Sequence, residues 1–148
     1  MKTITLTLTA AAALSIAGAA AAENWNVVSR SAATVYMIDV DSIAQAEGAT
    51  TARVARVPAA GPATDLSHTI SDLSVRCSAN QSKPGVEVVY GEDGAEAERI
   101  DDGYDFDGIR PNSLDAFVKQ IVCDGDRGAQ AFPTIKAFIE AGRPGAPR

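Results

Sequence analysis

The hydrophobic and polar positions along the chain predict β-strands over most of its length. Runs rich in β-branched and aromatic residues alternate with polar segments that contain glycine or proline, which is typical of strands joined by short turns. The pattern predicts about six strands, within residues 24–28, 34–39, 50–57, 68–77, 86–90 and 95–100. Short connections favour antiparallel pairing, with Pro58 ending the third strand and the turn GEDG joining the last two. The polar residues 41–49 are expected to leave the sheet.

The period of the apolar residues becomes helical near the C-terminus. Four of them, at i, i+3, i+4 and i+7, share one face of a helix: Leu114, Phe117, Val118 and Ile121. Asn112 or Ser113 can cap the start of this helix, and Asp115 with Lys119 makes an i,i+4 pair. A second, shorter helix is predicted within residues 132–142. The predicted fold class is therefore α+β, a small antiparallel β-sheet with a C-terminal helix packed on one face and a short extra helix after it.

Residues 1–22 have the pattern of a secretory signal peptide. Lys2 precedes an uncharged run rich in threonine and alanine, and small residues at 20–22 come before the first acid, Glu23. A membrane-spanning helix is the alternative, but the run has few large apolar residues and an Ala-x-Ala site follows it. Cleavage after Ala22 would place the chain in the periplasm or the medium, without a lipid anchor because no cysteine follows the cleavage site. We expect one domain at 23–142, no membrane span after cleavage, and a disordered tail at 143–148.

The balance of acidic and basic residues bears on whether the protein binds nucleic acid. The 148-residue sequence has 19 acidic and 13 basic side chains, a net charge of −6. Removal of Lys2 with the signal peptide leaves 12 basic against 19 acidic side chains, or −7. Nucleic-acid binding needs a concentrated basic surface that neutralises phosphates. The balance therefore argues against a nucleic-acid partner.

The two cysteines, Cys77 and Cys123, are expected to form a disulfide, because an exported chain meets an oxidising compartment. The alternative is a reactive thiol, but neither cysteine lies in a Cys-x-x-Cys pair or beside a histidine. The bridge would close a 46-residue separation. The chain-entropy model gives such a loop about 4 kcal/mol of stabilisation.

Asp39 and Asp41, in the stretch VYMIDVDSIA, are the first candidates for chemistry. Residues two apart on a strand project from the same face, so these carboxylates could share a cation or a proton. Against this, Ser42 follows at once, and aspartate and serine favour turns because their side-chain oxygens bond nearby backbone N–H groups. A metal site also needs more ligands than two. We interpret the stretch as a strand that runs into a side-chain-capped turn.

The remaining candidates are an acidic segment, ERIDDGYDFDG, and the only histidine, His68. Residues 101–107 lack the ligand and glycine spacing of an EF-hand, which favours a solvated acidic loop over a calcium site of non-standard geometry. No serine elbow, P-loop or dinucleotide motif occurs in the chain. We predict no catalytic residues, no metal ligands and no cofactor. The alternative is a small hydrolase or metal-dependent enzyme that uses the acidic loop.

An ordered set of features carries a family resemblance. Trp25 is followed by VYMIDVDSI, a strand rich in valine and arginine, Cys77 at the end of a later strand, YGEDG, and IRPNSLDAFVKQIVC closing on Cys123. In order and spacing this set resembles the surface-adhesin protein E family, from Trp25 to Cys123. The chain departs from that pattern by lacking a lipoprotein cysteine and by extending past Cys123 with a second helical segment.

The resemblance implies an antiparallel sheet with a helix on it, PAS-like in outline, without cofactor or catalytic residues. It also implies an exported bacterial protein that binds other proteins, either of the host matrix or of the cell envelope. The prediction is therefore a non-enzymatic, disulfide-linked binding module of the cell envelope, similar to adhesins. A homodimer through an exposed sheet edge is left open.

Overall fold

The computed structural model describes residues 22–145. Residues 1–21 of the predicted signal peptide and residues 146–148 of the predicted disordered tail lie outside the described residues. The described chain contains two helices, α1 (Leu114–Asp124) and α2 (Ile135–Glu140). It also contains eight strands: β1 (Trp25–Arg30), β2 (Thr34–Ala46), β3 (Ala49–Pro58), β4 (His68–Arg76), β5 (Gln81–Tyr90), β6 (Glu96–Ile100), β7 (Asp107–Gly108) and β8 (Ala131–Phe132).

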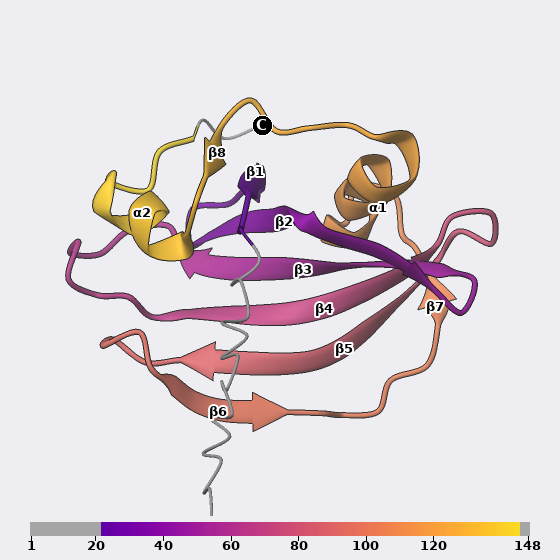
Figure 1. Ribbon diagram of the computed structural model, residues 1–148, viewed down its shortest axis with the longest axis horizontal. Coiled ribbons are helices and arrows are strands. Elements are labelled where there is room, and N and C mark those ends of the chain that lie inside the picture. The colour runs from indigo at the N-terminus through magenta and orange to yellow at the C-terminus, as the bar shows by residue number, and fades with distance from the viewer. Residues whose placement is uncertain (1–21, 146–148) are drawn as a thin grey trace, which may run out of the picture.

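All eight strands belong to one antiparallel sheet in the order β6-β5-β4-β3-β2-β1-β8 (Figure 1). Strand β7 pairs with the start of β5, and β6 pairs with the end of β5. Strands β1 to β6 follow one another in space as they do in sequence, because each connection is a short turn or loop. The α+β class predicted from sequence is observed. The predicted number of six strands is too low, because the two-residue strands β7 and β8 add to the sheet.

Strand β2 continues through the polar segment that was expected to leave the sheet. Pairing with β3 shifts between Asp39 and Ala44, where four residues of β2 lie opposite one residue of β3. Ser42 stabilises this bulge, since its hydroxyl donates to the Asp39 carbonyl at 2.6 Å and accepts from the Arg53 N–H at 2.9 Å. The bulge lets a polar stretch stay in the ladder up to Ala46.

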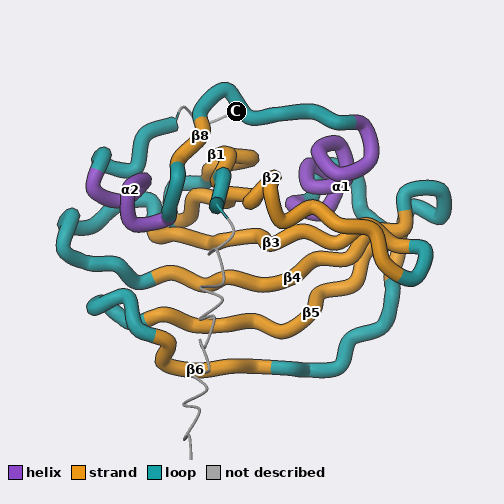
Figure 2. Tube along the Cα trace, viewed as in Figure 1, coloured by secondary structure: helices purple, strands orange, loops and turns teal. Residues whose placement is uncertain are grey.

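The sheet has a hydrophobic cluster on each face. Side chains alternate between faces along a strand, so Ile38 and Val54 lie on the face covered by α1, while Met37 and Ala55 lie on the face covered by α2. The α1 cluster is Val28, Ile38, Ala52, Val54, Leu73, Val75, Ile109, Val118 and Ile121. The α2 cluster is Trp25, Val35, Met37, Ala55, Val57, Ile135, Phe138 and Ile139. Figure 2 shows the two helices at opposite ends of the sheet.

Helix α1 begins at the predicted cap but is anchored differently from the prediction. Ser113 is the N-cap, and its hydroxyl accepts the Ala116 N–H at 3.2 Å. The predicted Asp115 to Lys119 ion pair does not form. Asp115 instead accepts a hydrogen bond from Ser82 of β5, and Lys119 donates to the side chain of Asn80 at 2.8 Å. Both side chains therefore tie the helix to the sheet, since those partners lie closer than the helical neighbour.

A disulfide between Cys77 and Cys123 joins the segment after β4 to the last turn of α1, with the Cα atoms 5.8 Å apart. This is the pairing that the cysteine count predicts. The bond fixes the C-terminal end of α1, while Ser82 and Asn80 hold its N-terminal half. The position of α1 across the sheet is thus set at both ends.

The prediction of a disordered tail at 143–148 is wrong for Arg143, which is only 4% exposed. Its guanidinium donates to the carbonyl oxygens of Gly61, Pro62 and Asp65 at 2.9 to 3.3 Å. In turn, Arg30 donates to the Arg143 carbonyl at 2.7 Å. These hydrogen bonds hold the chain after α2 against the loop between β3 and β4.

Candidate functional site

Asp39 and Asp41 occupy different environments and do not form a site. The Asp39 carboxylate is buried and accepts the backbone N–H groups of Asn24 and Asp41 at 2.9 and 3.2 Å. It also pairs with Arg53 at 2.7 Å, and Arg53 pairs with Glu23 at 2.6 Å. The Asp41 side chain is exposed. Asp39 therefore joins the segment before β1 to β2 and β3. The turn predicted after this stretch is wrong, because β2 continues past the bulge to Ala46.

His68 is the only histidine of the sequence, and it makes no catalytic arrangement in the described residues. Its ring stacks on Tyr90 at 4.4 Å between centroids, and Nδ1 lies 2.7 Å from the carbonyl oxygen of Leu66. Because a carbonyl oxygen only accepts, Nδ1 carries the proton and donates. Burial lowers the pKa of His68 below its ordinary value of 6.5. A neutral ring bonded to a backbone carbonyl stabilises the start of β4.

The acidic loop at residues 101–107 lies at the sheet edge and is solvated. Residues 101–105 are exposed. The carboxylates of Asp101 and Asp107 accept the backbone N–H groups of Gly103 and Gly108 at 3.1 and 2.7 Å. Between residues 22 and 145, no group of three or more histidine, cysteine, aspartate or glutamate side chains is placed to hold a metal ion.

Part of the sheet face that carries α1 has no helix over it, and this region is the candidate site. Register places Tyr36, Arg56, Thr69 and Val89 side by side on four neighbouring strands, β2 to β5. Paired residues of antiparallel strands share a face. We call these four residues, with Thr34 and Glu87, the open face. A hollow of about 490 Å³ lies over its outer end and is lined by Thr34, Arg56, Thr69, Glu87 and Val89, among others.

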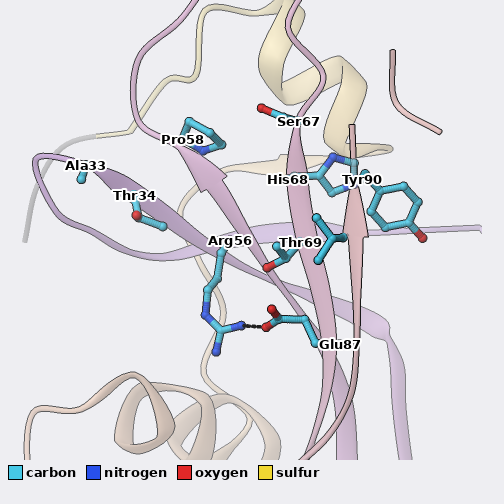
Figure 3. Close-up of a pocket in the computed structure, with 10 residues that line it drawn as sticks. Ala33, Thr34, Arg56, Pro58, Ser67, His68, Thr69, Glu87 and Tyr90 are labelled. Carbon is cyan, nitrogen blue, oxygen red and sulfur yellow. Dashed lines mark hydrogen bonds and ion pairs between the residues drawn. The ribbon is translucent and has the colours of Figure 1, made fainter. Parts of the chain in front are cut away.

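Arg56 is the central polar group of the open face (Figure 3). Its guanidinium pairs with Glu87 at 2.7 Å, and the two side chains remain 40% and 33% exposed. A buried hydroxyl, Thr69 Oγ1, lies on the same face and makes no hydrogen bond to the described residues. Figure 3 also shows that His68 and Tyr90 point away from Arg56, as the strand alternation requires. His68 and Tyr90 nevertheless line the same hollow as Arg56 and Glu87, from the end of the sheet where β4 begins.

A second hollow, of about 480 Å³, lies beside the first and shares Arg56 with it. Its wall combines sheet residues with the start of α1 and the acidic loop: Tyr36, Arg56, Ser82, Pro84, Tyr104, Asp105, Asp107, Gly108, Arg110, Ser113, Leu114 and Asp115. The two hollows together give a groove with both signs of charge and three tyrosines, Tyr36, Tyr90 and Tyr104. Such a surface offers hydrogen bonds and ion pairs to a polar partner.

The comparisons with known proteins give no family to this chain. No protein-family model, curated protein sequence or solved structure matches it. The resemblance to surface-adhesin protein E therefore stays a hypothesis. In the described residues, neither helix is long and apolar enough to cross a membrane.

Sequence reasoning missed the open face because its residues are scattered. Arg56 and Glu87 are 31 positions apart in the sequence. The local pattern of neither strand predicts that the two side chains form an ion pair. One signal was present: arginine at position 56 interrupts an otherwise apolar strand, as Arg53 does three residues earlier. A charged residue in a central strand indicates a place where the sheet is not fully covered or where an ion pair is needed.

Proposed function

We propose that the protein is a non-enzymatic binding module of the bacterial cell envelope and that a partner protein docks on the open face. The observation that carries the proposal is a row of half-buried polar and apolar side chains that crosses four neighbouring strands and lines a hollow. None of the six open-face residues belongs to either hydrophobic cluster of the described chain. The groove is what the fold offers to another molecule.

The chemistry of the groove supports a protein partner. Arg56 and Glu87 are partly exposed and already oriented by their ion pair, so they lose little side-chain freedom when a partner binds. Tyr36 and Tyr104 line the neighbouring hollow, and tyrosine and arginine are enriched at protein interfaces. The proposal includes export, supported by the signal-peptide pattern of residues 1–22, and a PAS-like outline, supported by the sequence resemblance to surface-adhesin protein E.

Site-specific photo-crosslinking in the native cells tests the proposal. A photoreactive amino acid replaces Thr34, at the end of the open face farthest from β6, and in a matched variant it replaces Glu140 on the exposed side of α2. We expect a reproducible crosslinked protein from position 34 and none from position 140. Crosslinking from position 140 alone, or equally from both positions, would contradict docking on the open face.

Cell fractionation and protease accessibility separate the two forms of the proposal. An adhesin is exposed on intact cells, so added protease should remove the protein from them. A module of the envelope interior is degraded only after the outer layer is permeabilised. Recovery of the protein from the cytoplasm with residues 1–22 retained would contradict export altogether.

A further inference from the structure

The negative charge of the protein is concentrated in one segment. Residues 92–107 contain one base, Arg99, and eight acids: Glu92, Asp93, Glu96, Glu98, Asp101, Asp102, Asp105 and Asp107. Removing these from the totals of 19 acids and 13 bases leaves 11 acidic and 12 basic side chains in the rest of the sequence. All eight acids are exposed. The excess of negative charge therefore belongs to this segment alone.

The same segment forms a free edge of the sheet. Strand β6 is last in the strand order and pairs with β5 on one side only, and no described strand lies on its other side (Figure 2). A strand in this position presents a row of backbone N–H and C=O groups that can pair with an added strand. The free backbone ladder is an observation independent of the charge.

An exposed aromatic residue lies just beyond β6. Tyr104 is 52% exposed and is the large hydrophobic side chain most open to solvent in the described residues. Two residues later, Phe106 packs under the Arg76 guanidinium at 3.8 Å, which holds the segment against the end of β4. Tyr104 therefore stands on an anchored part of the edge, where exposed tyrosines often contribute to interfaces.

The charge determines which strand can be added. If a second copy paired with β6 by two-fold symmetry, Glu98 at the middle of the strand would face its own copy, and like charges opposite each other destabilise a sheet. A lysine- or arginine-rich strand would instead place a base opposite each acid. The edge thus disfavours self-association and is complementary to a basic partner.

We propose that β6 and the residues that follow it accept an extended, lysine- or arginine-rich segment of a partner protein as an additional strand. This inference goes beyond docking on the open face, because it concerns pairing of backbone groups at the edge strand β6; the two regions meet at Tyr104, Asp105 and Asp107, which also line the second hollow. Main-chain hydrogen bonds supply the affinity, and the acids and Tyr104 select the sequence. Long-range attraction by the acidic segment also speeds the encounter at low salt.

Titration of the full chain with short blocked peptides tests the inference. The main probe alternates lysine and valine, a second probe has glutamate in place of lysine, and a third is the lysine peptide with alternate backbone nitrogens methylated. We expect binding of the first probe only, because the second is repelled and the third cannot complete the ladder. Equal binding of the methylated peptide, or no binding of the unmethylated one at low salt, would overturn strand addition.

Two charge-reversal variants locate the site. Glu98→Lys should weaken the lysine peptide about fivefold, which corresponds to the loss of one exposed ion pair. Glu47→Lys, at the exposed turn between β2 and β3, changes the net charge equally and should leave the affinity unchanged. Equal weakening by both variants would show a general charge effect and refute the β6 site. Because this assay does not involve Thr34, its failure leaves the crosslinking test of the open face intact.

Discussion

Asp39 offers the sharpest test of the structural interpretation, since Asp41 provides a matched control two residues away. Replacing Asp39 by alanine removes a carboxylate that is 3% exposed and bonded to Arg53 and to the backbone N–H groups of Asn24 and Asp41. Replacing Asp41 removes an exposed carboxylate whose hydrogen bond from the Asn24 side chain is 3.5 Å long. The two substitutions remove the same chemical group, so the difference between their effects on the free energy of unfolding reports the difference between the two environments.

The expected cost of Asp39→Ala is about 3 kcal/mol of the free energy of unfolding. A hydrogen bond to a charged group contributes about 1.5 to 3 kcal/mol when buried. The ion pair adds less, about 0.5 kcal/mol, because Arg53 is 36% exposed and water screens it. Asp41→Ala should cost less than about 0.5 kcal/mol, as surface changes usually do.

Urea denaturation followed by circular dichroism measures both variants against the parent chain with its disulfide intact. Asp39→Ala should also lower Tm by about 10 °C, while binding to any partner should persist below the transition. A loss under about 1 kcal/mol for Asp39→Ala, or equal losses for the two variants, would refute the structural role assigned to the buried carboxylate.

Three further predictions concern other parts of the fold. Replacing Cys77 and Cys123 by serine should lower the unfolding free energy by about 4 kcal/mol, measured by urea denaturation, and reduction of the parent chain should have the same effect. Burial lowers the pKa of His68 in the folded chain below its ordinary value of 6.5, so the unfolded chain binds a proton more readily than the folded chain. The free energy of unfolding should therefore fall as the pH is lowered from about 7.5 to about 5.5, and His68→Phe should reduce this dependence on pH. Arg143→Ala should cost about 2 kcal/mol in thermal unfolding because it removes a buried side chain that donates to three loop carbonyls, whereas exposed Lys136→Ala should cost almost nothing.

Local hydrophobic spacing placed the six longer strands and both helices, but it ended β2 seven residues too early and began β5 five residues too late. Residues 81–85 were predicted as a turn because of their polar, proline and glycine content, yet residues 81–84 pair with β4. The helical period of Leu114 to Ile121 identifies α1, and a polar residue at 113 caps it, because these are interactions between neighbours in sequence. The run VYMI at 35–38 is apolar at successive positions, a pattern of strands that are buried on both faces. Read in that way, it would have indicated a second helix packed on the opposite face of the sheet.

What could not be predicted depends on contacts between distant residues. The bulge that keeps residues 40–43 in the sheet needs the Arg53 N–H as a partner for Ser42, and nothing in the local sequence indicates that contact. Arg143 lies in a segment without apolar residues, yet it is buried because carbonyls from the loop at 61–65 converge on it. The open face is likewise assembled by register across four strands.

Trp25 gives the protein an internal optical probe. It is the only tryptophan of the sequence, it is fully buried in the α2 cluster, and its indole N–H donates to Glu23 at 2.9 Å. The disulfide, by contrast, holds the helix on the other face. Tryptophan emission therefore reports on the α2 layer, while the larger part of the helical circular dichroism comes from the 11 residues of α1 on the other face, against 6 residues in α2. Their transitions in reduced and oxidised protein would show whether the central sheet transmits unfolding from one layer to the other.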